Sequence, residues 1–450
     1  MYFFNGHNRF LSIFFLVLTC TCSPVFSQQI DCTGVKLIDN IHVPQKVVVV
    51  LAGGTTRFVK DLFTTIKTIN ETENLPENER IKLHVIPGSS NSDVANTLGI
   101  SSTDAAKYLE VDQKFSSYDI WAQDCMELCA GKTSEGKLVP AVFDTNRGRG
   151  LAGLPKVLAD TWGLAYFKNP SSSQAHGDYG GNLEVVPNED IMVSGNTITP
   201  QCKAFFEKMG YSGRIYNPNT KWLSVGHIDE CMSFIPTLQS PGGYSIVKAD
   251  PSHALDLLET ATDDEFENLN SDYKSLLLKV RSTLLARHNN PQAGKGTEEG
   301  NFIDLNRKIS EINEQNATEL KNFIRKVNNA PNKEFQEVAW PCLYEGSNPD
   351  NPSGCHAYLP GVVNLTVLRD HLLVPATYFP PFDRTIVARF KAQGNIVHFI
   401  DDEAYHDSMG EIHCGTNVLR SLDKQLFTSS DIARADATRR MFNKVHSLNH

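Results

Sequence analysis

The chain has 450 residues, of which 40% are hydrophobic and 21% are charged, a composition typical of a globular protein with a large core. Its formal charge of -10 and isoelectric point near 5.8 argue against a nucleic-acid partner, and no basic run stands out. Beyond the N-terminal region no segment is apolar for long enough to span a membrane, so we expect neither nucleic acid nor membrane as a partner.

The N-terminus has the pattern of a secretion signal. Arg9 precedes an apolar run from Phe10 to Cys20, and a short polar stretch leads to Ser27. The apolar run is shorter than the about 20 residues that span a bilayer, and compact residues at 25 and 27 fit cleavage after Ser27. We therefore predict a signal peptide over residues 1–27 and a secreted, extracellular protein. Export would expose three glycosylation sequons, which begin at Asn70, Asn316 and Asn364.

Strand-like and helix-like runs alternate along the rest of the chain, and no linker divides it into two domains. The predicted strands are, in chain order, 46–51, 82–86, 117–121, 126–130, 137–143, 183–187, 222–226, 231–236, 243–248, 360–368 and 395–400. The predicted helices are 57–69, 102–109, 154–162, 199–209, 253–287, 303–328 and 384–393. Such alternation predicts an α/β architecture. We expect one catalytic domain over 28–450, with the polar, helical stretch 253–335 outside its core.

Ten cysteines are present, and two of them, Cys20 and Cys22, lie in the predicted signal. Cys342 and Cys355 bracket a loop rich in Gly, Asn, Pro and Ser, which favours a disulfide between them in an oxidising compartment. If Cys414 is a free thiol, seven cysteines remain, so at least one more should be unpaired.

Three short polar segments carry reactive groups: Trp121–Asp124, Val225–Glu230 and Gly410–Asn417. A buried cysteine is more often a small hydrophobic residue than a nucleophile, but Cys414 lies beside His413 in a polar, glycine-containing turn, which suggests an activated thiol. If 222–229 is extended, His227 and Asp229 share one face. Paired carboxylates suit a guanidinium, whose planar fork of donors matches them. The segments therefore predict thiol attack on a guanidino carbon.

Two further segments, Gln123–Glu127 and Gly180–Glu184, are rich in oxygen ligands. Hard cations such as Ca²⁺ take six to eight oxygens, including backbone carbonyls, although composition alone supports such a site only weakly. A third segment, Asp144–Gly150, is a turn with two arginines, which could equally be a solvated surface loop.

Taken in this order, the motifs resemble the catalytic domain of the protein-arginine deiminases, the calcium-dependent peptidylarginine deiminases of vertebrates. The matching runs are Trp121–Glu127, Val142–Asp144 with Arg147–Leu151, Gly181–Val185, Trp222–Glu230 and Gly410–Asn417. The resemblance covers most of the chain from about residue 46 onward. It implies the pentein fold, a pseudo-fivefold α/β propeller with the active site at its centre.

The resemblance also implies roles for individual residues. Cys414 matches the nucleophile and His227 the general acid, while Asp124 and Asp229 match the carboxylates that clamp the guanidinium. Arg149, with Arg147 in support, matches the arginine that holds peptide carbonyls. The residues that match the active-site calcium are Gln123, Glu127 and Glu184, with carbonyls near Gly180 and Leu183.

Several positions depart from the family pattern. Cys125 and Gly148 stand where the family has an acidic and an asparagine ligand of a second calcium, so only Asp144 and Thr145 remain and we expect one calcium site. Ser408 replaces an arginine of the substrate entrance. The two immunoglobulin-like domains that precede the family's catalytic domain are not found here, and a signal peptide is atypical of the vertebrate enzymes.

We therefore expect hydrolysis of peptidyl-arginine to peptidyl-citrulline and ammonia, through a covalent thiouronium on Cys414, in arginine-containing peptides or proteins. Two alternatives stay open. One is a small-molecule guanidine enzyme of the same fold, a free-arginine deiminase or an amidinotransferase. The other is a catalytically silent secreted binding glycoprotein, which would not need the intact quartet of Asp124, His227, Asp229 and Cys414.

Overall fold

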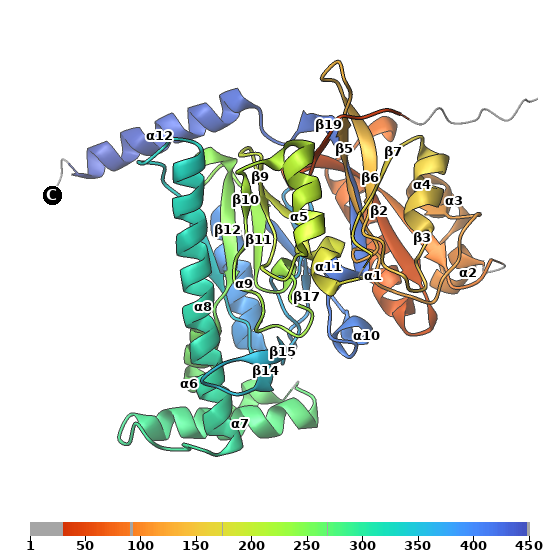
Figure 1. Cartoon of the computed structure of the whole chain (residues 1–450). Helices are drawn as coiled ribbons and strands as arrows, with labels where there is room; N and C mark the ends of the chain where they lie inside the picture. Colours follow the sequence, from red (N-terminus) through yellow and green to blue (C-terminus); the bar gives the residue numbers. More distant parts are fainter. Residues whose placement is uncertain (1–29, 91–92, 173, 268, 448–450) are drawn as a thin grey trace, which may run out of the picture.

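The computed structural model describes residues 30–90, 93–172, 174–267 and 269–447, so the predicted signal peptide lies outside the described residues. Within these ranges five sheets repeat one ββαβ order: two antiparallel strands, a helical crossover, and a third strand parallel to the second. A parallel pair requires such a crossover, and each sheet has one (Figure 1). Five repeats of this unit are the predicted pentein, pseudo-fivefold α/β arrangement.

The last unit joins the two ends of the chain. Its first strand, β19 (Thr416–Gln425), pairs antiparallel with β2 (His42–Leu51), which pairs in parallel with β3 (Lys82–Pro87). β2 carries four consecutive valines, all fully buried, because a strand with neighbours on both edges and both faces covered has no solvent side. Pairing of residues near 420 with residues near 45 closes the set of five.

The remaining strands of the first two units are β1 (Gly34–Lys36), β5 (Met126–Lys132), β6 (Leu138–Asp144), β7 (Ala165–Lys168), β8 (Glu184–Val186), β9 (Ile191–Val193) and β10 (Ile215–Tyr216). Those of the next two are β11 (Met232–Pro236), β12 (Tyr244–Ala249), β13 (Glu337–Trp340), β16 (Thr366–Leu368), β17 (His371–Pro375) and β18 (Ile396–Ile400). β4 (Leu109–Val111) extends the fifth sheet, and β14 (Tyr344–Ser347) with β15 (Ser353–Ala357) forms a separate hairpin.

The helices that cross between strands are α4 (Leu154–Trp162), α5 (Pro200–Phe206), α6 (Pro251–Thr260), α7 (Ser271–Arg287), α8 (Glu298–Val327), α9 (Pro380–Gln393) and α1 (Thr56–Thr72). Shorter helices are α2 (Val94–Leu98), α3 (Ser102–Tyr108), α10 (Glu403–His406) and α11 (Ile412–Gly415), and α12 (Ser429–Ser447) ends the described chain. α1 shows why these segments are helical: Phe58, Leu62, Ile66 and Ile69 recur on one face and are all buried.

The stretch 253–335 forms the enlarged crossover of the third unit. The single helix expected over 253–287 is two helices, because a short 3₁₀ turn at Asp263–Phe266 and the cap Asn270 separate α6 from α7. α8 stands on the outer side of the sheets (Figure 1). Its inner face, with Phe302, Ile309 and Leu320, nevertheless belongs to the largest apolar cluster, so the prediction that this stretch lies outside the core is wrong for that face.

Two predicted strands are loops. In 117–121 the Ser117 hydroxyl accepts the N–H of Asp119, so side chains satisfy backbone groups that a neighbouring strand would otherwise take. In 222–226 only Leu223 makes an isolated bridge, and Gly226 has a φ of 79°, which ends any extended run. The expected strand 360–368 is reduced to β16.

The eight cysteines of the described residues are all free thiols, so the predicted Cys342–Cys355 disulfide is wrong. Cys355 lies on β15, where its sulfur faces Gly346 of β14; a Cβ at Gly346 would be 2.4 Å from it. Glycosylation at the three sequons stays a prediction, although the folded chain buries each asparagine. The three asparagines are each at most 3% exposed, and their side-chain amides are hydrogen-bonded inside the protein: Asn70, Asn316 and Asn364.

Among the helices of the described ranges, none is both long and apolar enough to cross a membrane.

The contact between the first two units offers a test of the packing. Phe143 on β6 is fully buried, and its ring centroid lies 5.3 Å from that of Phe205 and 4.9 Å from that of Phe206. Phe143→Ala should lower the free energy of unfolding by about 3–5 kcal/mol, because it leaves a cavity between units. The control Phe399→Ala, at a ring 36% exposed, should lower it by about 1 kcal/mol or less. Urea unfolding measures both, and equal losses would contradict this packing.

Candidate active site

Cys414 lies in α11, a single turn that leads directly into β19. The turn is tight: a Cβ at Gly410 would be 2.4 Å from the Trp121 ring, and one at Gly415 would be 2.4 Å from Tyr405. Glycine is therefore required on both sides of the thiol. The Thr416 hydroxyl donates to the Ile412 carbonyl at 3.0 Å and holds the turn, and the thiol is 6% exposed.

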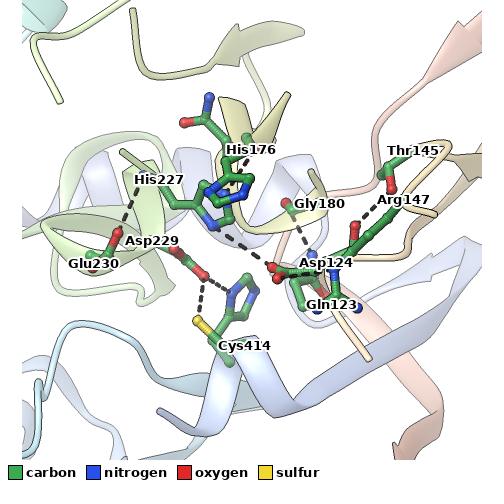
Figure 2. Close-up of polar contacts among 12 residues, drawn as sticks. Gln123, Asp124, Thr145, Arg147, His176, Gly180, His227, Asp229, Glu230 and Cys414 are labelled. Atoms are coloured by element: carbon green, nitrogen blue, oxygen red, sulfur yellow. Dashed lines mark hydrogen bonds and ion pairs between the residues drawn. The ribbon is translucent and has the colours of Figure 1, made fainter. Parts of the chain in front are cut away.

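His227 and Asp229 lie in a loop before β11. His227 precedes a 3₁₀ turn, Ile228–Glu230, so the expectation that the two residues share one face of a strand is wrong, although their side chains do converge. His227 Nε2 donates to the His176 carbonyl at 2.9 Å, since a carbonyl can only accept. Nδ1 is thereby turned toward Asp124, 3.7 Å from its Oδ1 (Figure 2). The free imidazole nitrogen thus faces the site.

Asp229 is the meeting point of the polar contacts. Its Oδ2 accepts from His413 Nδ1 at 2.8 Å and from the Cys414 thiol at 3.6 Å. The four predicted catalytic residues, Asp124, His227, Asp229 and Cys414, therefore surround one space, although they come from segments almost 300 residues apart (Figure 2).

Three atoms around this space are buried and have no hydrogen-bond partner: Asp124 Oδ1, Asp229 Oδ1 and His227 Nδ1. Buried polar atoms in folded proteins are nearly always paired, so unpaired ones at a single place indicate a ligand. Two free carboxylate oxygens suit a planar cation that carries several N–H donors. Gly181 leaves the room, because a Cβ there would lie 2.7 Å from His227 Nδ1 and 2.9 Å from Asp229 Oδ2.

The electrostatics of the ligand-free site oppose ionisation of the thiol. Burial raises the pKa of Cys414 well above its usual value, and Asp229, Asp124 and Glu230 raise it further. Burial also raises the pKa of Asp124, although His227 and Arg147 act in the opposite direction. A cation bound between the two aspartates would favour both anions. The site is therefore prepared for a positively charged ligand.

The two predicted substrate-binding arginines lie in different surroundings. Arg147 is fully buried: it donates to Asp119 Oδ2 at 2.8 Å, its Nε is 3.7 Å from Asp124 Oδ2, and it lies over the Tyr179 ring. Its Nε and Nη2 are buried without partners. The side chain of Arg149 is 60% exposed, with its Nε 3.8 Å from the same Asp119. Arg147 therefore forms the wall of the site, and Arg149 lies at its surface.

The predicted calcium ligands gather beside the site. Gln123, Glu127, Leu183 and Glu184 line a small cavity of about 40 Å³, and Gln123 Nε2 donates to Glu127 at 2.8 Å and to the Gly180 carbonyl at 3.3 Å. Burial raises the pKa of Glu127 to about 8 and that of Glu184 to about 7. Two buried carboxylates, an amide and two carbonyls fit a hard cation in donor type. The amide nitrogen now bridges two of these oxygens, as a cation would.

The groups of the second family calcium site are engaged elsewhere. The Cys125 thiol donates to the Ala122 carbonyl, and burial raises its pKa. Asp144 accepts from the Tyr166 hydroxyl and from the Asn146 N–H, while the Thr145 hydroxyl donates to the Asp124 carbonyl. Loss of a second site stays a prediction, and these contacts agree with it.

Three residues of the site are not predicted as site residues from the sequence: Asp119, His176 and Asn364. The sequence predicts that His413 activates the neighbouring thiol, but its Nδ1 is bonded to Asp229 instead. Burial lowers its pKa, but Asp229, Glu184 and Glu127 outweigh this and raise the pKa to about 9. His413 is thus a cation that contacts Asp229 at Oδ2.

A family model described as "Protein-arginine deiminase (PAD)" matches residues 213–425. The chain is 29% identical to human protein-arginine deiminase type-1 over 336 residues, which cover 67% of this chain and 46% of that protein. It is 25% identical to the type-4 enzyme of Rattus norvegicus over 379 residues, covering 75% of this chain and 52% of that protein. The chain spans about half the length of these curated relatives.

The fold is shared with the agmatine deiminase of C. jejuni. The two structures superpose with a TM-score of 0.51, at 13% identity, over 86% of this chain and 96% of that one. With the five ββαβ units, this similarity identifies the pentein fold.

Gly181 tests the ligand space directly. In a Cys414→Ala background, where no bond to sulfur can form, Gly181→Ala should weaken binding of a blocked arginine amide at least about tenfold, because the methyl group would occupy the space of the ligand. Isothermal titration calorimetry measures the affinity. The matched control is Gly53→Ala, which adds a Cβ in open space at a glycine that, like Gly181, has no positive φ. Unchanged binding by the Gly181→Ala protein would place the ligand elsewhere.

Proposed function

Because the chain belongs to the protein-arginine deiminase family, we propose that it hydrolyses the guanidinium group of arginine within peptides, giving peptidyl-citrulline and ammonia. The single observation that carries the proposal is the set of three unpaired buried atoms around the Cys414 thiol. A guanidinium offers N–H donors to Asp124 Oδ1 and Asp229 Oδ1 and places its carbon beside the sulfur.

In the first half of the reaction the charge of the bound guanidinium favours the thiolate, and the proton of the Cys414 thiol passes to His227 Nδ1. The sulfur electron pair adds to the guanidino carbon, and the C=N electron pair moves to nitrogen. Protonated His227 then gives its Nδ1 proton to the departing nitrogen, the C–N bond breaks, and ammonia leaves. The product is a thiouronium on Cys414. Asp124 and Asp229 fix the plane of the group throughout.

In the second half water replaces ammonia. Neutral His227 accepts a proton from water at Nδ1, and the oxygen adds to the same carbon. The C–S bond then breaks, its electron pair returns to sulfur, the remaining proton of the added oxygen passes to solvent, and the ureido group of citrulline is released. His227 is held for both roles by the hydrogen bond of its Nε2 to the His176 carbonyl, which fixes the ring and leaves Nδ1 toward the site.

The choice of a peptide over free arginine rests on the family relation and on two arginines. Arg149 is exposed at the surface beside Asp119, and Arg147 has two buried donors without partners, which suit carbonyl oxygens. The rival is a small-molecule guanidine enzyme of the same fold, a free-arginine deiminase or an amidinotransferase. In a transferase an amine would take the place of water.

Calcium is part of the proposal, at one site made by Gln123, Glu127 and Glu184 with the Gly180 and Leu183 carbonyls. When bound, the cation would supply positive charge to two buried carboxylates. Gln123 links this site to the nucleophile, because its backbone N–H donates to the Cys414 carbonyl at 3.1 Å and its neighbour is Asp124. A cation that orders Gln123 would therefore also help to order Cys414 and Asp124, which lie on two sides of the ligand space. We also propose that the enzyme acts outside the cell, where calcium is abundant.

Turnover of a blocked arginine peptide tests the function. We expect citrulline in the peptide, with kcat/KM above that for free arginine by at least about tenfold, because buried polar groups that are left unpaired disfavour the smaller substrate. A folded Cys414→Ser protein should form no product, since a hydroxyl is far less ionised than a thiol. Faster turnover of free arginine would favour the small-molecule rival. Turnover by the Cys414→Ser protein would exclude the thiol mechanism.

Calcium binding should strengthen as the pH rises. At pH 6 Glu127 and Glu184 hold protons in the folded chain, with pKa values of about 8 and about 7, and calcium must displace them. Without calcium, stability should fall between pH 6 and 8.5, because unfolded glutamates, with a pKa of 4.5, are already ionised while the folded ones still bind protons.

Melting temperatures in chelator and in saturating calcium, at pH 6 and 8.5, measure both effects. The stabilisation by calcium should be larger at pH 8.5 and should be reduced in Glu184→Gln, whereas Glu135→Gln, at an exposed turn, should behave as the wild type. A calcium effect that is equal at both pH values, or unaffected by Glu184→Gln, would contradict the proposed site.

A further inference from the structure

We propose that Asn364 is a catalytic residue, whose side-chain amide stabilises the anionic sulfur of Cys414. The inference rests on the proposed function in one respect, that Cys414 is the nucleophile. Asn364 lies in the loop before β16, is 3% exposed, and belongs to a sequon whose amide is unavailable to a glycan in the folded chain.

The orientation of the amide follows from its two partners. Asn364 Oδ1 accepts the backbone N–H of Cys414 at 3.1 Å, and Nδ2 lies 3.1 Å from Sγ. A backbone N–H can only donate, so the oxygen of the amide must face it. The nitrogen must then face the sulfur, and it donates a hydrogen bond to Sγ.

The loop that carries Asn364 is tied to the nucleophile turn along its length. The Gly361 N–H donates to Glu411 at 2.9 Å, and the His413 N–H donates to the Asn364 carbonyl at 3.2 Å. These two contacts hold the loop of Asn364 against the nucleophile turn. Farther along, and separate from the amide, the hydroxyls of Thr366 and Thr416 lie 2.8 Å apart.

The sulfur needs such a donor because its other neighbours are acidic. Asp229 Oδ2 lies 3.6 Å from Sγ, and Asp124 and Glu230 act on it from nearby. His413 does not help directly, since its Nδ1 is bonded to Asp229. Among the side chains of the described residues, Asn364 is the one that donates a hydrogen bond to Sγ, and the backbone of Glu411 also favours the ionised sulfur.

A donor at this position assists both halves of the reaction. Hydrogen bonds to an ionised acceptor are stronger than those to a neutral one, so the amide favours thiolate over thiol. The hydrogen bond increases the fraction of Cys414 that is thiolate. The accompanying loss of nucleophilicity of each thiolate is smaller than this gain. When the C–S bond breaks in the second half, the electron pair returns to sulfur and the same N–H meets the charge as it forms, while the remaining proton of the added oxygen passes to solvent.

The test compares Asn364→Asp with a matched control, Thr366→Val. Asn364→Asp keeps an acceptor for the Cys414 N–H and the same shape, but replaces the donor to sulfur with a negative oxygen. Thr366→Val removes a hydroxyl from the same pair of segments without touching the sulfur. Three experiments are done on each: steady-state kinetics with a blocked arginine peptide and with free arginine, peptide mass mapping of the rate at which iodoacetamide alkylates Cys414, and thermal melting.

We expect Asn364→Asp to lower kcat by about 100-fold, as loss of one preorganised donor does at other sites of developing charge, with KM within about threefold. Alkylation of Cys414 should slow at least about tenfold, because the attacking species is the thiolate. Thr366→Val should stay near the wild type in all three experiments. If Asn364→Asp does not fold, Asn364→Ala, which only removes atoms, takes its place with the same expectation.

Two results would overturn the proposal: a folded Asn364 variant whose kcat is near normal, or one whose kcat falls while alkylation of Cys414 keeps the wild-type rate. A rise in KM alone would likewise assign Asn364 to substrate binding. The alkylation assay needs no substrate, so it decides the role of Asn364 even if the wild-type protein fails to deiminate peptides, a result that would count against the proposed function instead.

Discussion

The site depends on buried negative charge that the protein leaves without full compensation. Asp124 and Asp229 each present one buried oxygen that has no hydrogen-bond partner, in loops that precede the first strands of two of the five units. Burying an unpaired charged atom costs several kcal/mol in principle, so the arrangement persists only because the surrounding fold fixes it. This uncompensated negative charge is the basis of specificity, because a guanidinium supplies both a positive charge and the hydrogen-bond donors that the two oxygens lack.

The same uncompensated negative charge also controls the ionisation of the Cys414 thiol. In the ligand-free protein burial and three carboxylates keep Cys414 protonated, which protects a buried thiol from unspecific chemistry. His413 is a cation but is committed to Asp229, and His227 is turned toward Asp124. Activation is therefore coupled to the arrival of a positively charged substrate, and the neutral amide of Asn364 adds a donor without adding charge that would repel that substrate.

The fivefold architecture explains how residues so far apart meet. Each functional side chain lies in a loop or short turn next to the first strand of a unit: Gln123 and Asp124 before β5, Gly181 before β8, His227 and Asp229 before β11, Asn364 before β16 and Cys414 before β19. Because the five units follow one order, these equivalent positions face one centre. Pairing of β19 with β2 completes the ring and brings the thiol of the last unit beside the aspartates of the first and third.

Much of this could be predicted from the sequence, and the failures have physical causes. Apolar periodicity located most strands and helices, and the polar motifs identified Cys414, His227 and both aspartates. Periodicity predicts a strand around His227, because it does not reveal that Gly226 turns the chain. Asn364 and His176 were missed, since their partners are about 50 residues away and no local pattern marks a contact between loops. The disulfide failed because spacing says nothing about the direction of a side chain.

Direct observation of the bond between sulfur and substrate carbon tests the central claim most sharply. Turnover of a blocked arginine peptide, quenched with acid within the first catalytic cycle, should yield a fragment containing Cys414 whose mass has increased by that of the substrate less ammonia, and this adduct should convert to citrulline product at the rate of turnover. Citrulline formed at the full rate while Cys414 never carries the adduct would show that the carbon is attacked by another group, and the account of the site given by its two unpaired aspartates and its buried thiol would be wrong.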